Sequence, residues 1–304
     1  MKHLYIIGNG FDQHHNIPSG YSNFKRWLEE YDIDTFYKVE NILETSDPKW
    51  WNEFETSLGK PFAVKLYAEG VASENQPDYA SADYRDRDLY VAEYEVERVL
   101  GGLVSDLKRD FQEWASGLPA GDGVLAVKIE TKNSVFLTFN YTLTLEKMYG
   151  ISPERVLHIH GSALDKDSIV VGHGCDYGVY RNRLEDDLPA EEYEKWFEEA
   201  ASQYSDDYPT SQAKDAAVKA MMELHKDVKS IIADNQAFFQ SLKDVEMIHI
   251  YGFSFAEVDI PYVMEIVKNV DIKQVSLEVS YFTESDKENV KNMPEGQVSG
   301  ISLN

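Results

Sequence analysis

Cysteine is almost missing from this chain of 304 residues, which holds only Cys175. One thiol cannot form an internal disulfide, and it cannot supply a zinc site built from several thiolates. Because structural disulfides belong to oxidising compartments, this usage favours a reducing setting. We therefore expect a cytoplasmic protein.

Long hydrophobic runs are missing as well. A membrane-spanning helix needs roughly 18 to 20 consecutive apolar residues, and no stretch of the sequence reaches that length. The amino terminus has only Lys2 before a short apolar run that ends in glycines, which is unlike a signal peptide. We expect no leader, no transmembrane helix and no membrane partner.

Basic residues are scarce beside acidic ones: 29 Lys and Arg stand against 54 Asp and Glu, a formal net charge of −25. A surface this acidic repels phosphate backbones, which argues against non-specific binding of nucleic acids. Hydrophobic residues are plentiful, at 43% of the chain with 12% aromatic. That is enough for a sizeable core, so we expect a globular protein.

Six short apolar runs end in polar or glycine-containing turns, a pattern typical of strands that are buried on both faces. They are residues 4–7, 135–139, 156–159, 169–171, 247–251 and 275–279. Buried strands of this kind suit a parallel sheet covered by crossover helices. The sequence therefore predicts an α/β fold, with a Rossmann-like, mostly parallel sheet and helices on both faces.

Helical patterns fill the long intervals between these runs. Apolar residues recur at spacings of three and four through 89–118 and 216–242, and a further helix is expected at 191–201. The polar segment 73–88, rich in Tyr and Asp, predicts a loop or a mobile lid. We expect one domain over 1–304, with helical insertions at about 28–130 and 184–243.

The stretch "LYIIGNGFDQHHNIPSG", residues 4–20, carries the first candidate ligand loop. A strand that runs into Gly8-Asn9-Gly10 makes a tight turn whose amide N–H groups can approach a phosphate or pyrophosphate. The alternative is a glycine turn chosen for packing. The usual dinucleotide fingerprint has a third glycine where Gln13 stands here, which weakens a simple dehydrogenase interpretation.

Three polar residues follow on the same loop, at the strand's carboxyl edge, where open α/β sheets bind ligands. Asp12 either accepts hydrogen bonds from ribose hydroxyls or satisfies local backbone amides. For His14 and His15, exposed positions on the loop are the more common role.

Asn140 and His160 are the candidate catalytic residues. Asn140 follows the strand 135–139, where it either caps the next helix or bonds a ligand ribose or an attacking water. In "RVLHIHGSA" the side chains of His158 and His160 share one strand face. His160, nearer the loop, is the preferred general base, because the pKa of histidine lies close to working pH. His158 either supports His160 or is a hydrogen-bonded core histidine.

Two further strand ends carry glycines with polar residues. "VVGHGCD" presents His173 between two glycines, and "IYGFSFAEVDIPYV" presents Gly252, Ser254 and Asp259. Gly252 and Ser254 are placed to approach an adenosine or ribose. Asp259 either accepts from a sugar hydroxyl or caps the helix that begins near Ile260.

Taken together, these blocks resemble the bacteriophage abortive infection AbiH family. The resemblance rests on "LYIIGNGFDQHHNIPSGYSNF", "WWNEFETSLG", "FNYTLTLEKMY", "LHIHGS", "VGHG" and "IYGFSFAEVDIPYV", which span nearly the whole chain. It implies a role in bacterial phage defence. The helical insertions would then offer a surface for self-association or for a phage-derived trigger protein.

The same order of blocks resembles, more distantly, the sirtuin-like NAD-consuming effectors of anti-phage systems. That resemblance implies NAD as ligand or substrate, held by the glycine loops and the polar residues beside them, with chemistry at Asn140 and His160. The binding residues that the resemblance implies are Gly8, Gly10, Gly252 and Ser254, and Asn9 stands where its first motif has a small alanine. From their places on the same loops, Asn9, Asp12 and Asp259 complete the predicted binding set. Deacylase sirtuins carry a four-cysteine zinc module, which a single cysteine cannot build, so protein deacylation is disfavoured.

Three functions remain open from the sequence. The first is an NAD glycohydrolase in which Asn140 orients the ribose, His160 activates water and no metal takes part. The second is a metal-dependent hydrolase that uses His158, His160, His173 and Cys175. The third is a non-catalytic nucleotide sensor of the defence response.

Overall fold

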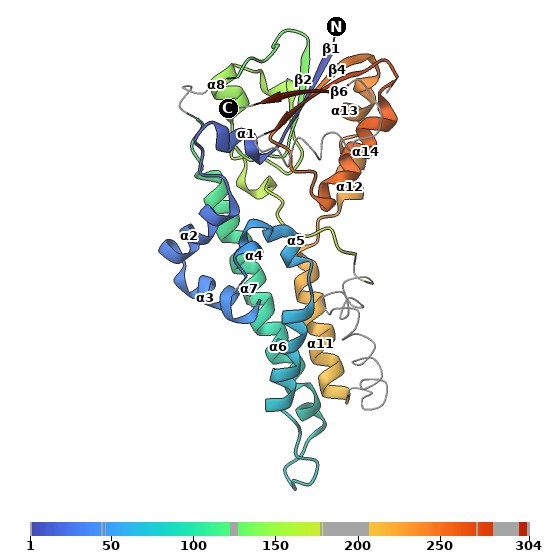
Figure 1. Ribbon diagram of the computed structural model, residues 1–304. Helices are drawn as coiled ribbons and strands as arrows, with labels where there is room; N and C mark the ends of the chain where they lie inside the picture. The colour runs from blue at the N-terminus through green and yellow to red at the C-terminus, as the bar shows by residue number, and fades with distance from the viewer. Residues whose placement is uncertain are drawn as a thin grey trace. The chain divides into compact units, whose positions relative to one another are not determined.

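The protein falls into two compact units in the computed structural model (Figure 1). The structure describes residues 2–43, 45, 47–121, 127–176, 178, 207–271, 273–281 and 298–302. We call the first unit the sheet unit; it comprises residues 1–24, 111–170 and 227–304. We call the second the helical unit; it comprises residues 25–110 and 171–226.

The sheet unit alternates strands with short helices along the chain. Its elements are β1 (Lys2–Ile7), α1 (Asn9–His14), β2 (Ser134–Thr138), α8 (Thr144–Tyr149), η2 (Pro153–Arg155), β3 (Val156–His158), η3 (Lys166–Ser168), α12 (Val228–Asp234), α13 (Gln236–Gln240), η5 (Ser241–Asp244), β4 (Val245–Tyr251), η6 (Glu257–Asp259), α14 (Ile260–Asn269), β5 (Ser276–Tyr281) and β6 (Val298–Ser302).

The helical unit has no strand among its described residues. Its elements are most of α2 (Tyr21–Tyr31), then α3 (Ile33–Ile42), α4 (Pro48–Asn52), α5 (Phe54–Leu58), α6 (Phe62–Glu74), η1 (Asp86–Tyr90), most of α7 (Val91–Ser116), α11 (Tyr208–Met221) and η4 (Met222–Leu224).

The described strands form one six-stranded sheet of order β3-β2-β1-β4-β5-β6, and every pairing is parallel. The order reverses between β1 and β4. Open α/β sheets bind their ligands at such a switch point, outside the carboxyl ends of the strands. The predicted Rossmann-like fold is confirmed.

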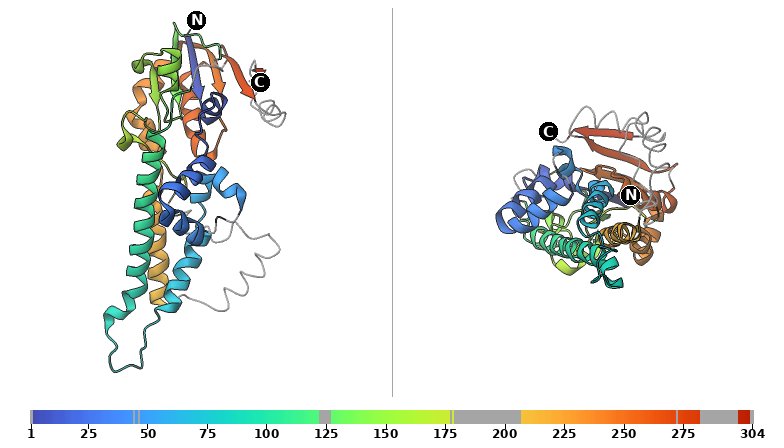
Figure 2. Two further views of the ribbon diagram at one scale, coloured as in Figure 1. Left: turned by 90° about the vertical axis from the view of Figure 1, so that its left-hand side faces the viewer. Right: turned by 90° about the horizontal axis from the view of Figure 1, so that it is seen from below.

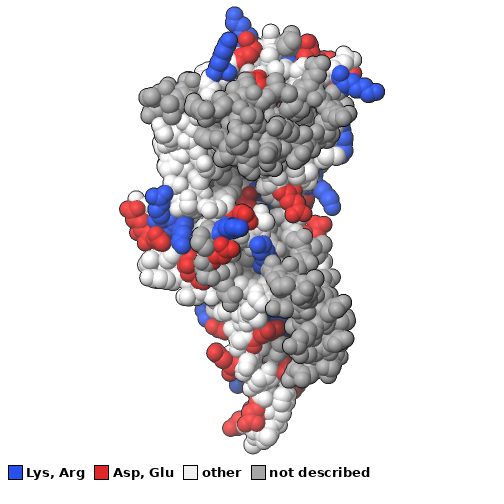
Figure 3. Space-filling view, in the orientation of Figure 1, with Lys and Arg blue, Asp and Glu red and all other residues white. Residues whose placement is uncertain are grey.

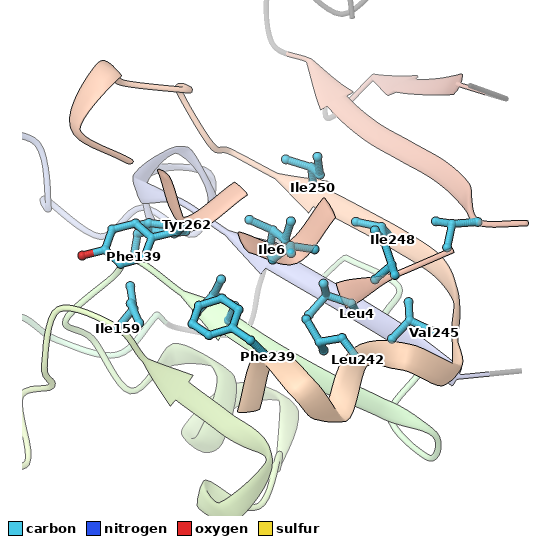
Figure 4. Close-up of a cluster of buried hydrophobic side chains, with 14 of the residues drawn as sticks. Leu4, Ile6, Phe139, Ile159, Phe239, Leu242, Val245, Ile248, Ile250 and Tyr262 are labelled. Atoms are coloured by element: carbon cyan, nitrogen blue, oxygen red, sulfur yellow. The ribbon is translucent and has the colours of Figure 1, made fainter. Parts of the chain in front are cut away.

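Both faces of the sheet are covered, which explains why β1 reads as a continuous apolar run. Leu4 and Ile6 point into a cluster with Phe239 and Tyr262 from α13 and α14 (Figure 4). The alternate residues of β1, Tyr5 and Ile7, belong to the opposite cluster, which also contains Phe11 of α1 and Leu145 of α8. Successive residues of a strand face opposite sides, so a sheet covered by two layers needs apolar side chains at every position.

Five of the six apolar runs are strands, but residues 169–171 are not. This run lies in a loop, where the Val170 N–H donates to the His160 carbonyl at 2.9 Å. Burial of Ile169 and Val171 accounts for the apolar pattern without a strand. The strand β6 was not predicted.

The helix expected over 216–242 is interrupted. The first part, α11, ends at Met221, and α12 begins at Val228, where the Asp227 carboxylate accepts from the Ser230 N–H at 3.0 Å. This carboxylate caps the new helix α12. The spacing of apolar residues is the same before and after the break, so the spacing could not reveal where one helix ends and the next begins. The helix expected at 191–201 lies outside the described residues.

Small side chains allow α6 and α11 to lie side by side in the helical unit (Figure 2). Ala68 and Ala72 of α6 and Ala213 and Ala217 of α11 are all fully buried. The helical unit starts and ends earlier than the predicted insertions, because α12 and α13 cover the sheet instead. No helix within the described ranges is long and apolar enough to cross a membrane.

Candidate functional site

The glycines after β1 and β4 let two loops meet backbone to backbone at the switch point. The Gly8 N–H donates to the Tyr251 carbonyl at 2.9 Å, and the Gly10 N–H donates to the Gly252 carbonyl at 2.9 Å. A Cβ at Gly8 would lie 2.6 Å from the Gly252 oxygen. Gly252 has φ +63°, and a Cβ there would lie 2.1 Å from the Phe11 nitrogen. Packing therefore accounts for these glycines. Two of the N–H groups that the sequence suggested for anion binding, those of Gly8 and Gly10, instead donate to carbonyls of this chain.

Asn9 closes the first loop on itself. Its Nδ2 donates to the Ser19 carbonyl at 3.2 Å, and the Ser19 hydroxyl donates to its Oδ1 at 2.5 Å. Both ends of the Asn9 amide are thus bonded to the turn that precedes α2. In this structure the side chain of Asn9 shapes the loop.

Asp12 lies in helix α1 rather than on a loop, and it joins the β1 end to the β2 end. Its two carboxylate oxygens accept from the Thr142 hydroxyl at 2.7 Å and the Thr144 hydroxyl at 3.0 Å. Burial raises the pKa of Asp12 to about 6, although hydrogen bonds from both threonines and Asn140 oppose the rise. This role, a tie between two loops, differs from both roles considered from the sequence.

The expectation of an exposed loop position for His15 is wrong. His15 is buried at the end of α1, where its Nδ1 donates to the Phe11 carbonyl at 2.6 Å and its Nε2 accepts from the Tyr149 hydroxyl at 2.6 Å. His14 is the last residue of α1 and is half-buried. The short helix directly after β1 points His15 into the core and leaves His14 half-buried. Two neighbouring histidines look equivalent in the sequence, so this difference could not be predicted from it.

Asn140 is buried at the carboxyl end of β2 and does not cap a helix, since α8 begins only at Thr144. Its Nδ2 donates to the Gly8 carbonyl at 3.1 Å, which fixes the amide against the β1 loop. No donor among the described residues reaches its Oδ1. A buried acceptor without a partner is costly, so this atom is a candidate to receive a donor from a ligand.

His158 holds Asn140 in place from the neighbouring strand. Its Nδ1 lies 3.0 Å from the Asn140 carbonyl oxygen and its Nε2 lies 2.9 Å from Glu146 Oε1. Both ring nitrogens of His158 are therefore occupied by contacts within the sheet unit. A ring bonded at both nitrogens is not placed to take a proton from water, which leaves His158 the positioning role.

His160 leaves β3 at the level where Asn140 leaves β2. Thr138 pairs with His158 in the parallel register, and Asn140 and His160 each stand two residues further along. The His160 imidazole is buried among the rings of Phe139 and Tyr262. Asp259, at the start of α14, has its Oδ1 3.7 Å from His160 Nε2 and makes no helix-capping bond.

Ser254 is exposed on the loop after β4, three residues beyond Tyr251 at the end of the strand. In the sheet unit the structure thus collects Gly8, Gly10, Asn140, His158 and His160 at the carboxyl edge, with Asp12 and Asp259 buried beside them. The sequence patterns did not single out Glu146, Thr142 or Thr144. The threonines follow Asn140 within "FNYTLTLEKMY", and their position beside a strand end was the available signal.

Two blocks of the sequence, "WWNEFETSLG" and "VGHG", meet in the helical unit instead. The Gly172 N–H donates to Glu55 Oε1 at 3.3 Å, and a Cβ at Gly59 would lie 3.2 Å from that of His173. Glu55 also lies 2.7 Å from the fully buried Nζ of Lys226, a residue that the sequence did not single out. Glu55 of the first block thus forms an ion pair with Lys226 and also accepts a hydrogen bond from the second block.

His173 is locked in its neutral form inside the helical unit. Its Nε2 donates to the Met221 carbonyl at 3.2 Å, while its Nδ1 accepts from the Cys175 N–H at 3.2 Å. Burial, more than any other effect, lowers the pKa of His173 to about 4. The expectation of an imidazole presented for chemistry is not met, because both ring nitrogens bond the backbone.

The four residues proposed as metal ligands fall into two pairs, one in each unit. His158 and His160 belong to the sheet unit, and His173 and Cys175 belong to the helical unit. His158 and His173 use both ring nitrogens within their own unit. Across the ranges that the structure describes, no group of three or more His, Cys, Asp or Glu side chains could hold a metal ion.

The fold and the edge of polar side chains define an α/β protein of the Rossmann-like class. Residues 4–281 match the bacteriophage abortive infection AbiH family. The chain belongs to this family, which makes it a protein of bacteriophage abortive infection. The comparison with curated proteins and the comparison with solved structures found no match. The AbiH resemblance is confirmed, and no comparison found the sirtuin-like one.

Proposed function

We propose that this AbiH protein is a nucleotide hydrolase that binds NAD at the carboxyl edge of its sheet and cleaves the bond between nicotinamide and ribose. The observation that carries the proposal is the buried Asn140 amide, whose Nδ2 is anchored on Gly8 and whose Oδ1 lacks a donor among the described residues. A ribose hydroxyl is a donor of the required kind. This hydrogen bond fixes the direction of the Asn140 acceptor in advance, so the side chain loses little conformational entropy when the sugar binds.

The bond to nicotinamide breaks with positive charge developing on the ribose, as in other glycosidic cleavages. Water then adds to the anomeric carbon, neutral nicotinamide departs with the bonding electrons, and the water proton passes to His160. The Asp259 carboxylate, 3.7 Å from His160 Nε2, stabilises the imidazolium that results. The products are nicotinamide, ADP-ribose and one proton.

The test is incubation of the purified full chain with NAD, followed by chromatographic measurement of nicotinamide and ADP-ribose. His160→Gln should lower the rate by about 10²-fold to 10⁴-fold, the usual loss when a general base is removed. Asn140→Ala should lower both the rate and the affinity for NAD. His14→Gln, at a half-buried position of α1, is the matched control and should hydrolyse NAD at the wild-type rate.

A non-catalytic nucleotide sensor is the second candidate, favoured by the burial of the His160 imidazole among the rings of Phe139 and Tyr262. A sensor needs the acceptor of Asn140 but no general base. A sensor would bind NAD without releasing nicotinamide, and His160→Gln would leave phage protection intact. If wild-type protein neither binds nor cleaves NAD, both candidates fail.

A further inference from the structure

The loop after α6, the start of α7 and the start of α11 lie at one end of the helical unit (Figure 1), and five tyrosines belong to these segments. We call this group the tyrosine tip; its members are Tyr79, Tyr84, Tyr90, Tyr94 and Tyr208. Tyr79 and Tyr94 are 60% and 62% exposed, and Tyr208 is 47% exposed. A contiguous patch of exposed, large aromatic side chains commonly marks an interaction site.

The rings of the tyrosine tip make contacts in two groups, a pair on the loop and a group of three around Tyr90. The centroids of Tyr79 and Tyr84 lie 5.4 Å apart, those of Tyr90 and Tyr208 lie 5.7 Å apart, and those of Tyr90 and Tyr94 lie 6.4 Å apart. The loop thus presents one pair of rings in contact, while η1, α7 and α11 present three rings together.

The loop backbone that carries these rings is ordered by its own hydrogen bonds. The Ser81 N–H donates to the Asp78 carbonyl at 3.0 Å and the Tyr84 N–H donates to the Ser81 carbonyl at 3.2 Å. At the start of η1 the Arg85 N–H donates to Asp88 Oδ2 at 2.9 Å, and the Asp88 N–H donates to the Arg85 carbonyl at 2.9 Å. Side chains on a backbone ordered in advance lose little entropy when a partner binds.

The surroundings of the tyrosine tip are acidic (Figure 3). The acidic side chains of this stretch are Asp78, Asp83, Asp86, Asp88 and Glu93, and its only arginines are Arg85 and Arg87. Arg85 turns back onto its own loop, where Nη1 donates to the carbonyls of Ala82 and Tyr84. Arg87 Nε lies 3.8 Å from the Asp88 carboxylate. Both cations are thus directed at partners within the loop.

We propose that the tyrosine tip is a docking surface for a protein whose contact face carries arginine and lysine. Guanidinium and ammonium groups bind over tyrosine rings, and the surrounding carboxylates pair with the same cations. Tyrosine and arginine are also the residues that dominate the binding energy of protein interfaces. A nucleic acid or a second copy of this chain, with its net charge of −25, would be repelled.

The experiment uses the full chain in bacteria challenged with phage, with a photo-crosslinking amino acid replacing Tyr79. Tyr37, which is 57% exposed on α3 of the same unit, is replaced in the matched control. The expected result is a crosslink at position 79, absent at position 37, to an identified protein whose crosslinked peptide is rich in Arg and Lys. Charge reversal by Asp83→Lys with Asp86→Lys should abolish it.

The identified protein is then purified and its affinity for this chain is measured. Tyr79→Ser with Tyr94→Ser should weaken binding by about tenfold or more, while Tyr37→Ser should leave it unchanged. A crosslink to nucleic acid, to an acidic peptide or to another copy of this chain would overturn the proposal. So would equal crosslinking at both positions, no crosslink at either, or unaltered affinity of the double variant. None of these outcomes depends on NAD hydrolysis.

Discussion

The sheet unit and the helical unit use residues of the same kinds for opposite purposes. His160 and His173 both stand in His-Gly pairs after apolar runs, yet His160 lies beside a carboxylate at the sheet edge. His173 bonds the backbone through both nitrogens and stays neutral. A motif therefore identifies a residue worth examining, and its hydrogen-bond partners decide whether it is available for chemistry.

Buried ionisable groups differ between the units in the same way. In the sheet unit, hydroxyls and amides surround Asp12, so burial favours its neutral form. In the helical unit, Lys226 is paired directly with Glu55. The first arrangement lets a carboxyl give up its charge, whereas the second keeps two charges and depends on both partners. Four experiments probe this contrast, in order of decreasing effect.

The largest effect should follow from removing one member of the ion pair in the helical unit. Lys226→Met leaves Glu55 partly buried without its partner, and loss of one partner costs about 3 to 5 kcal/mol of the free energy of unfolding. Urea unfolding followed by tryptophan fluorescence measures it. Adding Glu55→Gln, which keeps an acceptor for Gly172, should restore most of the loss. Equal instability of single and double variants would show that the pair is not the cause.

The close approach of two loops in the sheet unit predicts the next effect. Gly252→Ala forces a Cβ toward the Phe11 nitrogen and also strains a positive φ, a combined cost of about 3 kcal/mol. Gly150 is the matched control, since its φ is +62° and nothing lies within 4 Å of the position that a Cβ would take there. Gly150→Ala should cost only about 1 kcal/mol in the same denaturation assay. Similar costs at both sites would exclude the clash.

Opposite pH slopes should separate the two units. The pKa of Asp12 rises from 3.8 to about 6 on folding, so the folded chain holds this proton longer and stability falls as pH rises between about 4 and 6. The pKa of His173 falls from 6.5 to about 4, so the unfolded chain binds this proton first and stability rises with pH over that range.

Removing either titrating group should leave the pH dependence of stability that the other group causes. Asp12→Asn should make stability rise more steeply from pH 4 to pH 6, and His173→Gln should make it fall, each by about 2 kcal/mol relative to wild type. Denaturant titrations at several pH values measure the slopes, which are independent of any constant packing loss. Parallel curves for wild type and both variants would contradict the assigned burial effects.

The smallest effect concerns the residue that positions Asn140. Glu146→Gln keeps an acceptor for His158 Nε2 but weakens this contact, because a neutral amide oxygen accepts less strongly than a carboxylate, at a cost of about 1 kcal/mol. Nitrogen chemical shifts of the His158 ring should report the weakened hydrogen bond. Glu154→Gln, a fully exposed change in the same unit, should alter neither measurement. An unchanged His158 spectrum in Glu146→Gln would remove the assigned role.

Much of the fold was predictable, because buried parallel strands appear in the sequence as short, continuous apolar runs. Leu4 to Ile7 are apolar at every position, and turn residues follow, so periodicity and punctuation agree. The run 169–171 misled because burial in a loop produces the same pattern as burial in a strand. At the candidate site, the block around Asn140 was visible, but the contacts of Asp12 with Thr142 and Thr144 join residues 130 or more positions apart.

The α/β class, the positions of most strands and the family blocks follow from the sequence alone, because these depend on local spacing and on the apolar content of short segments. The packing role of Gly8 and Gly252, the burial of His173 in the helical unit and the pairing of Lys226 with Glu55 became visible only in the folded chain. Hydrogen bonding and desolvation act between atoms that the fold brings together from distant parts of the sequence. Residue type fixes what a side chain can donate or accept, and its neighbours in space fix which of those capacities remains for a ligand.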